Sequence, residues 1–194
     1  RLPEENLKTI LQSAVTYLEA AHHAGLLHLE LTPERILLAE EDKLLICGFS
    51  TDKLHYPPED LTASHDYRAP ELASFRGHLG KSTDYYSLGA ILYQGVCRVN
   101  PPDALTRLDA VDKQTPDPLT SANILGKGFF SGPTLSLIES LLMLKPGDRP
   151  QNADTLTDDL VDTGGLSDAI NTEVEQMGAV DDLPVVPPPA SPAS

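Results

Sequence analysis

The chain has 194 residues, of which 40% are hydrophobic and 22% charged, a composition typical of one globular domain with an appendage. Twenty-nine acidic residues against fourteen basic ones give a net charge of -15. A field of that sign repels phosphate backbones and anionic lipid headgroups, which argues against nucleic acid and bare membrane surfaces as partners. No apolar run approaches the roughly 20 residues that a membrane helix needs.

The two cysteines, Cys47 and Cys97, have neither metal-ligand spacing nor a disulfide framework pattern. They predict buried thiols in a reducing compartment, and hence a cytoplasmic location. The chain begins without Met at what looks like the start of a helix, so we expect it to be a piece of a longer protein.

The first predicted element is a helix that Pro3 opens and Gly25 ends. Its apolar residues recur at helical spacing on one face. They are Leu7, Ile10, Leu11, Ala14, Leu18 and Ala21. Two short apolar runs follow, at 36–38 and 44–46, and predict a small hairpin.

A polar stretch then continues to about Leu72, which is too long for a plain connector and is therefore expected to be functional. A second buried helix is predicted from Tyr85 to about Cys97, with Ser82 as its cap, and a short helix near 104–110. Two further helices are indicated by Leu135, Ile138, Leu141 and Leu142, and by Leu156 and Leu160 after a cap at Asn152. The glycine-rich run 126–132 predicts a turn rather than a phosphate-binding loop, because no strand precedes it.

The composition changes at about Asp162, after which aromatic residues are absent and five prolines follow residue 183. We therefore expect a domain at 1–162 and an acidic, then Pro-rich tail or linker at 163–194. A stripe of Leu166, Ile170, Val174 and Met177 predicts a possible short helix at 166–177. Such a short helix is stable only if it docks, and the alternative is an acidic linker.

Five short motifs occur in order among these elements. They are HLELTPERILL at 28–38, LICGFS at 45–50, YRAPE at 67–71, STDYYSLG at 82–89 and PGDRP at 146–150. In this order and spacing they resemble the large, C-terminal lobe of protein kinases, bacterial serine/threonine kinases in particular. The resemblance implies a mainly α (α+β) fold, a protein-kinase-like large lobe with small β-hairpins. It places the small N-terminal lobe, which covers ATP, outside this chain.

The same resemblance shows what the catalytic positions have lost. Glu30 stands at the base position with a side chain one methylene longer than aspartate, and Thr32 stands at the lysine position without a charge. Arg35 replaces a metal-binding asparagine, and Gly48 replaces the metal-binding aspartate. A register one residue earlier would put Cys47 there, which is no ligand for a hard cation. We therefore assign no catalytic, cofactor-binding or metal-binding residue and expect no cofactor.

One of these positions leaves two roles open. Arg35 could replace the charge of magnesium and hold a nucleotide's phosphates without metal, or it could be solvated or paired with a glutamate. Leu29 stands where the family has the arginine that receives an activation-loop phosphate. Phosphorylation of Thr51, Thr62 or Ser64 would thus have no clamp.

The structural motifs, by contrast, are retained. The resemblance implies that Glu71 and Arg149 form a buried pair that anchors the activation segment. It also implies that Asp84 caps the backbone of the catalytic loop and that His28 is a core imidazole. A scaffold that is kept while its chemistry is lost is the pattern of a pseudokinase.

Three functions are compatible with this sequence. The first is an inactive pseudokinase that acts as a protein-binding or regulatory module with a protein partner. The second is an unusual serine/threonine protein kinase that uses ATP and magnesium and whose small lobe lies outside this chain. The third is a structural spacer that leads into a Pro-rich linker and to a membrane anchor elsewhere in the parent, as bacterial relatives imply. In each case we expect these residues to be cytoplasmic.

Overall fold

The structure is a computed structural model that describes residues 3–38, 44–49, 65–73 and 78–157. The chain divides into two compact units, Arg1–Asp162 and Thr163–Ser194. The second unit, with the predicted helix at 166–177, lies outside the described residues, as do Leu160 and the three hydroxyl residues Thr51, Thr62 and Ser64. In the part of the chain that is described, no helix is long and apolar enough to cross a membrane.

The first helix, α1, extends over Glu4–His23 and confirms the predicted element. Pro3 precedes it, and Glu4 and Glu5 in its first turn favour the positive end of the helix dipole. Its buried face carries Leu7, Leu11, Ala14, Val15 and Leu18. The helix ends before Gly25, whose φ of 75° is a conformation that glycine adopts without strain.

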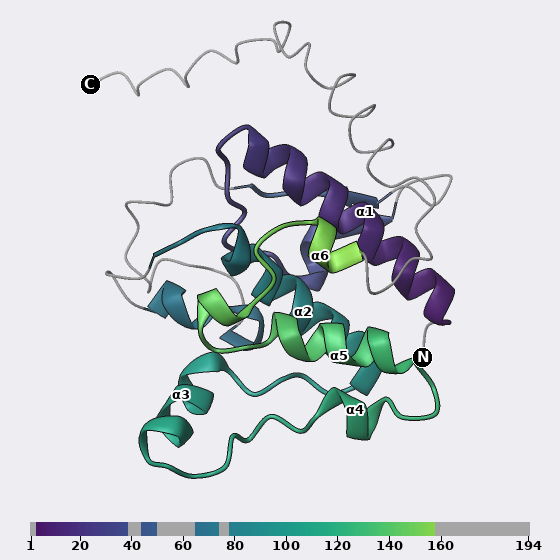
Figure 1. Ribbon diagram of the computed structural model, residues 1–194. Helices are drawn as coiled ribbons and strands as arrows, with labels where there is room; N and C mark the ends of the chain where they lie inside the picture. Colours follow the sequence, from purple (N-terminus) through teal and green to yellow (C-terminus); the bar gives the residue numbers. More distant parts are fainter. Residues whose placement is uncertain (1–2, 39–43, 50–64, 74–77, 158–194) are drawn as a thin grey trace, which may run out of the picture. The chain divides into compact units, whose positions relative to one another are not determined.

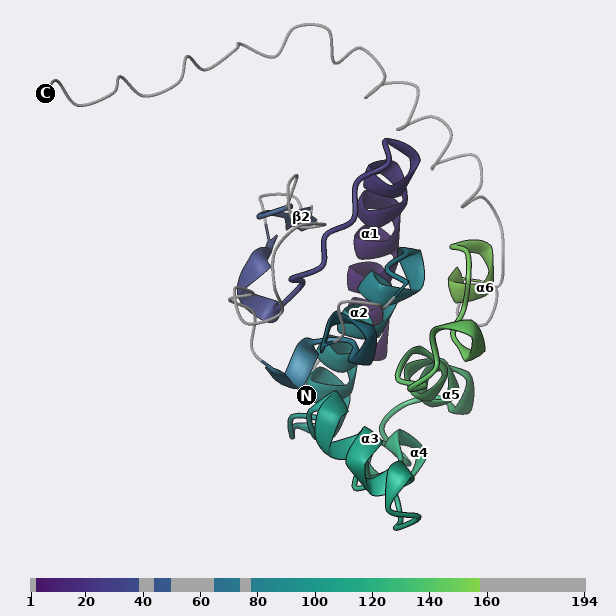
Figure 2. The same ribbon diagram turned by 90° about the vertical axis from the view of Figure 1, so that its left-hand side faces the viewer.

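The predicted hairpin is also present. Strands β1 (Ile36–Leu38) and β2 (Leu44–Ile46) pair antiparallel, with Ile36 opposite Ile46. Strand β2 contacts α1, and its Leu44 is only 1% exposed. Figure 2 shows the hairpin on one side of the second helix and the later helices on the other. This small sheet positions Arg35 and Gly48, two residues of the site described below.

Helix α2 (Lys81–Cys97) lies at the centre of the fold (Figure 1). It packs against α1, α4 (Ala122–Leu125) and α5 (Gly132–Leu141). The close approach to α5 depends on Gly89, since a Cβ atom there would lie 2.5 Å from the Cβ of Leu141. Buried side chains on α2 include Tyr85, Tyr86, Leu88, Leu92 and Tyr93. The core is therefore formed by helices around α2.

The prediction that Ser82 caps α2 is wrong. The helix begins at Lys81, and Gly80 before it is extended, with a φ of -164°. The N–H of Gly80 donates to Oγ1 of Thr83 at 3.1 Å, which satisfies one of the open donors at the helix start. Ser82 lies within the first turn and is buried, so its hydroxyl is not in the capping position.

The remaining predicted helices are present, two of them with small shifts at their ends and the last as far as the described residues extend. Helix α3 covers Ala104–Asp112, with Asp103 accepting from the N–H of Thr106, and α6 covers Asp154–Thr157, with Asn152 accepting from the N–H of Thr155. Short 3-10 turns occur at Pro33–Arg35, His65–Tyr67, Pro70–Ala73 and Pro146–Asp148. Residues 126–131 connect α4 to α5 as a turn, and Gly132 is the first residue of α5.

Candidate functional site

The candidate site joins the loop after α1 to the end of β2. The carboxylate of Glu30 accepts a hydrogen bond from Nη2 of Arg35 at 2.7 Å, and the Glu30 side chain is only 2% exposed. Nη1 of Arg35 donates to the carbonyl oxygen of Gly48 at 2.9 Å. Three of the four positions where the resemblance implies a lost catalytic group are thus in direct contact.

The backbone explains how these positions meet. The N–H of Arg35 donates to the carbonyl of Thr32 at 3.0 Å, closing the 3-10 turn before β1. The N–H of Cys47 donates to the carbonyl of Arg35 at 3.0 Å, which continues the hairpin by one pair beyond Ile36 and Ile46. The hairpin register therefore places Arg35 beside Gly48.

Thr32, the fourth altered position, is buried, and its side chain hydrogen-bonds to Glu34. That bond lowers the pKa of the Glu34 carboxyl from its ordinary value. The thiol of Cys47 is exposed, which corrects the prediction that both cysteines are buried; Cys97 is buried as predicted. The reason is that Cys47 continues β2 by one pair and lies two residues after Leu45, on the same face of the strand as that side chain, which is also exposed.

His28 is fully buried, as the resemblance implies. Its Nε2 lies 3.0 Å from the carbonyl oxygen of Cys47, and its Nδ1 lies 3.3 Å from the N–H of Glu30. Since a carbonyl can only accept and an N–H can only donate, both contacts require the neutral tautomer with the proton on Nε2. The ring also packs on Phe49, with 4.7 Å between ring centroids. His28 therefore ties the loop to the end of β2.

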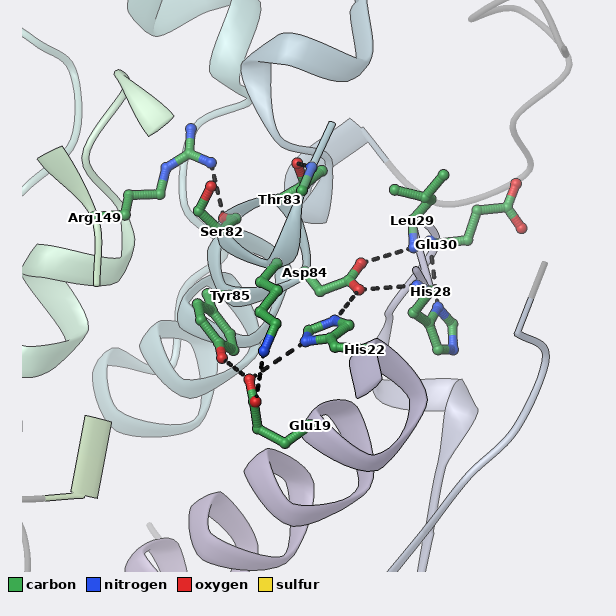
Figure 3. A network of polar contacts seen from close by, with 12 residues as sticks. Glu19, His22, His28, Leu29, Glu30, Ser82, Thr83, Asp84, Tyr85 and Arg149 are labelled. Atoms are coloured by element: carbon green, nitrogen blue, oxygen red, sulfur yellow. Dashed lines mark hydrogen bonds and ion pairs between the residues drawn. The ribbon is translucent and has the colours of Figure 1, made fainter. Parts of the chain in front are cut away.

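Asp84 holds the same loop from the other side (Figure 3). Its Oδ1 accepts from the N–H of Leu29 at 2.7 Å and its Oδ2 from the N–H of His28 at 2.8 Å. Leu29 has a φ of 63°, a left-handed conformation that is unfavourable for leucine. Two hydrogen bonds to a charged acceptor can hold such a residue in place. In Figure 3 the side chain of Glu30 points away from Asp84.

A buried network below Asp84 was missed by the sequence analysis. Nε2 of His22 lies 2.8 Å from Oδ2 of Asp84, and Glu19 contacts His22, Lys81 and the hydroxyl of Tyr85 (Figure 3). The available signal was the presence of Glu19 and His22, three residues apart, on the buried side of an otherwise apolar helix face. The network connects α1, α2 and the loop that carries Glu30.

The pKa values of this network follow from its contacts. Burial alone would raise the pKa of Glu19, but hydrogen bonds from His22, Lys81 and Tyr85 outweigh burial and lower it to about 2. Burial alone would lower the pKa of His22, but its bonds to Asp84 and Glu19 raise it. Both shifts favour an ionised Glu19 next to a protonated His22.

The predicted buried pair of Glu71 and Arg149 is present. Nη1 of Arg149 lies 2.7 Å from Oε1 of Glu71 and Nη2 lies 2.9 Å from Oε2, and both side chains are buried. Nη1 also donates to the carbonyl of Ser82 at 2.9 Å, a contact drawn in Figure 3. The pair thus joins the Pro70–Ala73 turn to the start of α2.

The residues at the site do not fit a magnesium ion. Magnesium requires oxygen ligands in near-octahedral geometry. Gly48 has no side-chain oxygen, Arg35 presents only N–H donors, and the Glu30 carboxylate is already bonded to Arg35. Throughout the described residues, no group of three or more His, Cys, Asp or Glu side chains could hold a metal ion.

Comparison with known proteins identifies the class to which this fold belongs. Residues 1–161 match the protein kinase domain family, so the chain belongs to that family. It is 30% identical over 105 residues to serine/threonine-protein kinase sck2 of Schizosaccharomyces pombe, across 52% of this chain and 16% of that kinase. It is 29% identical over 164 residues to serine/threonine-protein kinase RUNKEL of Arabidopsis thaliana, across 79% of this chain and 11% of that kinase.

Human ribosomal protein S6 kinase alpha-2 is 29% identical over 150 residues, across 75% of this chain and 20% of that kinase. A solved structure described as PpkA-294 apo form superposes with a TM-score of 0.63 at 22% identity, and the match covers 78% of this chain and 51% of that one. The chain therefore spans about half of that structure and a fifth or less of these curated relatives. The predicted fold, the mainly helical protein kinase lobe with a small antiparallel hairpin, is confirmed.

Proposed function

We propose that the chain is part of a pseudokinase, a protein kinase-like domain that transfers no phosphate and acts as a protein-binding or regulatory module. The observation that carries the proposal is the guanidinium of Arg35, which bridges the Glu30 carboxylate and the Gly48 carbonyl. In this family, these positions supply the catalytic base and hold the metal.

The physical argument concerns charge. Phosphoryl transfer depends on metal ions that neutralise the developing negative charge and on a carboxylate that orients the attacking hydroxyl. Here Oε2 of Glu30 accepts from Arg35 at 2.7 Å and the Glu30 side chain is only 2% exposed, so an attacking hydroxyl group has little access to the carboxylate. Thr32 brings no charge to the lysine position. Such electrostatic stabilisation is usually the largest catalytic contribution, and losing it at several positions supports an inactive domain.

The contacts that only support the fold are intact. The Glu71–Arg149 pair and the three bonds of Asp84 are all present and buried. Together they keep the loop, the Pro70–Ala73 turn and α2 in a kinase-like arrangement. An ordered surface without transfer chemistry suits a module that binds another protein.

The surface that suits a partner is a pocket of about 180 Å³ between the 65–73 segment and the start of α3. Its lining is mostly apolar, with Arg68, His65 and Asp103 as its ionisable members and Leu105 half exposed. Its lining consists of His65, Arg68, Ala69, Pro70, Ala73, Asp103, Ala104 and Leu105. We assign to it a protein segment that places one apolar side chain in the pocket. The net charge of -15 of the whole chain favours basic residues elsewhere in that segment, away from Arg68.

The catalytic half of the proposal predicts that the full parent protein, with its small lobe, incorporates no phosphate from radiolabelled ATP into itself or a generic protein substrate. The Glu30→Ala variant serves as the background. Magnesium-dependent incorporation that Glu30→Ala abolishes would contradict the proposal. It would favour the alternative, an unusual serine/threonine kinase. The carboxylate that Glu30 retains is the feature that supports this alternative.

The binding half predicts that peptides selected from a displayed random library against the chain bind at this pocket. Leu105→Asp should abolish binding of the selected peptides, because it places a charge at the apolar wall. Ile124→Asp is the matched control, since Ile124 is also exposed, at 70%, but lies on α4 away from the pocket lining. Selection that yields no peptide, or peptides that bind Leu105→Asp as well as the native chain, would contradict this assignment.

A further inference from the structure

The side chain of Arg35 is fixed by two different segments. Its Nη2 is bonded to the nearly inaccessible carboxylate of Glu30, and its Nη1 to the carbonyl of Gly48. Its backbone is held as well, to Thr32 on one side and to Cys47 on the other. The guanidinium therefore connects the 28–35 loop to the residues that follow β2.

The room for this guanidinium exists because residue 48 is glycine. A Cβ atom at position 48 would lie 2.3 Å from Nη1 of Arg35 and 3.3 Å from its Cζ, and the shorter distance is well inside normal contact. The φ of 80° at Gly48 is a further reason why a side chain is unfavourable there. The two replacements are thus sterically dependent on each other: arginine at position 35 uses the space that a side chain at position 48 would fill.

The charge of Arg35 matches this geometry. A carboxylate as buried as that of Glu30 needs a nearby cation, because an uncompensated buried charge is strongly destabilising. The guanidinium is permanently charged and cannot dissociate from the chain. A divalent cation in the same place would meet N–H donors and a positive charge instead of oxygen ligands.

We infer that Arg35 is a tethered cation that takes the place of a metal ion at this site and holds residues 44–49 against the 28–35 loop in the absence of any ligand. The inference rests on the proposed function in that the native site binds no metal. The tests below measure cation binding and stability, and none of them measures phosphate transfer. The pseudokinase proposal and the inference about Arg35 can therefore fail independently.

The first test measures Mn²⁺ binding to the 194-residue chain by electron paramagnetic resonance of free Mn²⁺. Arg35→Asn combined with Gly48→Asp removes the tethered cation and adds an amide oxygen and a carboxylate next to Glu30. We expect this double variant to bind Mn²⁺ roughly tenfold or more tightly than the native chain, since affinity for hard cations rises with the number of charged oxygen ligands.

The control is Arg98→Asp, which changes the net charge by the same two units. Arg98 is the exposed residue at the end of α2, with a φ of 62°, a conformation that aspartate tolerates. A gain by the double variant but not by Arg98→Asp supports the inference. Equal binding by the native chain and the double variant, or an equal gain by Arg98→Asp, overturns it.

The second test is a thermal-unfolding cycle on the two positions. Gly48→Ala should lower the melting temperature of the native chain, because the new methyl group displaces the guanidinium and strains the backbone. In the Arg35→Ala background only the backbone strain remains, so the loss should be smaller. An equal loss in both backgrounds would show that Arg35 does not use the space at Gly48 and would overturn the inference.

Discussion

Replacing Arg149 by alanine is expected to lower the free energy of unfolding by about 3–5 kcal/mol, because it leaves Glu71 as a buried charge without its partner. The guanidinium also donates to three backbone carbonyl groups, so the loss is not confined to the ion pair. Nε bonds to Met143 at 2.7 Å, Nη1 to Ser82 at 2.9 Å and Nη2 to Leu144 at 3.0 Å. All five N–H groups of the side chain therefore have an acceptor.

The measurement is urea unfolding followed by circular dichroism. Since small domains are stable by only about 5–15 kcal/mol, the alanine variant is close to the limit of folding. Glu71→Gln is the second variant, because it keeps the shape of the side chain and removes its charge. It should lose about 3 kcal/mol, because it leaves the Arg149 guanidinium as a buried charge without a carboxylate and turns an NH₂ group toward one of its donors.

A matched control is the exposed pair of Lys113 and Asp109, whose atoms are also 2.7 Å apart. Its side chains are 67% and 59% exposed, and exposed ion pairs contribute at most about 1 kcal/mol. Lys113→Ala should therefore change stability little. Comparable losses in Arg149→Ala and Lys113→Ala would show that burial of the Glu71–Arg149 pair carries no special weight.

Different parts of the structure were predictable for different physical reasons. The long elements, α1 and α2, follow from apolar periodicity, which is a local property of the chain. Helix α4 was missed because four residues are too few to show a helical period. The pairing of Glu71 with Arg149, which are 78 residues apart, could be expected only from the family resemblance, since no local pattern links such distant positions.

The candidate site shows the same division. The family resemblance predicted three separate losses, at Glu30, Arg35 and Gly48. The side chain of Arg35 bonds to both Glu30 and Gly48. A sequence motif gives no distances between side chains, so these bonds could not be predicted from it. Part of the answer was nevertheless available, because extending the predicted hairpin by one pair places Arg35 opposite Cys47, next to Gly48. The network of Glu19 and His22 was hidden because burial of a polar residue depends on α2, which is distant in sequence.

Asp84 offers the second large effect, because a single buried carboxylate serves three donors. It accepts from the backbone N–H groups of His28 and Leu29 and contacts Nε2 of His22, and its side chain is fully buried. Asp84→Ala should lower the free energy of unfolding by about 3 kcal/mol or more, since hydrogen bonds to charged groups contribute about 1.5–3 kcal/mol each. Asp84→Asn keeps the shape and should lose about 2 kcal/mol, because an NH₂ group would face a backbone donor.

A local measurement distinguishes this role from general destabilisation. Leu29 has a strained, left-handed backbone at a φ of 63°, and its N–H donates to Asp84. Asp84→Asn weakens this bond, so the loop should open and release the strain. Amide hydrogen exchange at His28, Leu29 and Glu30 should therefore accelerate more than exchange in α5. Asp109→Asn is the same chemical change at an exposed residue, and it should leave amide exchange in the loop and in α5 unchanged. If exchange in the loop and in α5 accelerates equally in Asp84→Asn, then Asp84 stabilises the fold as a whole and does not specifically position the loop that carries Glu30.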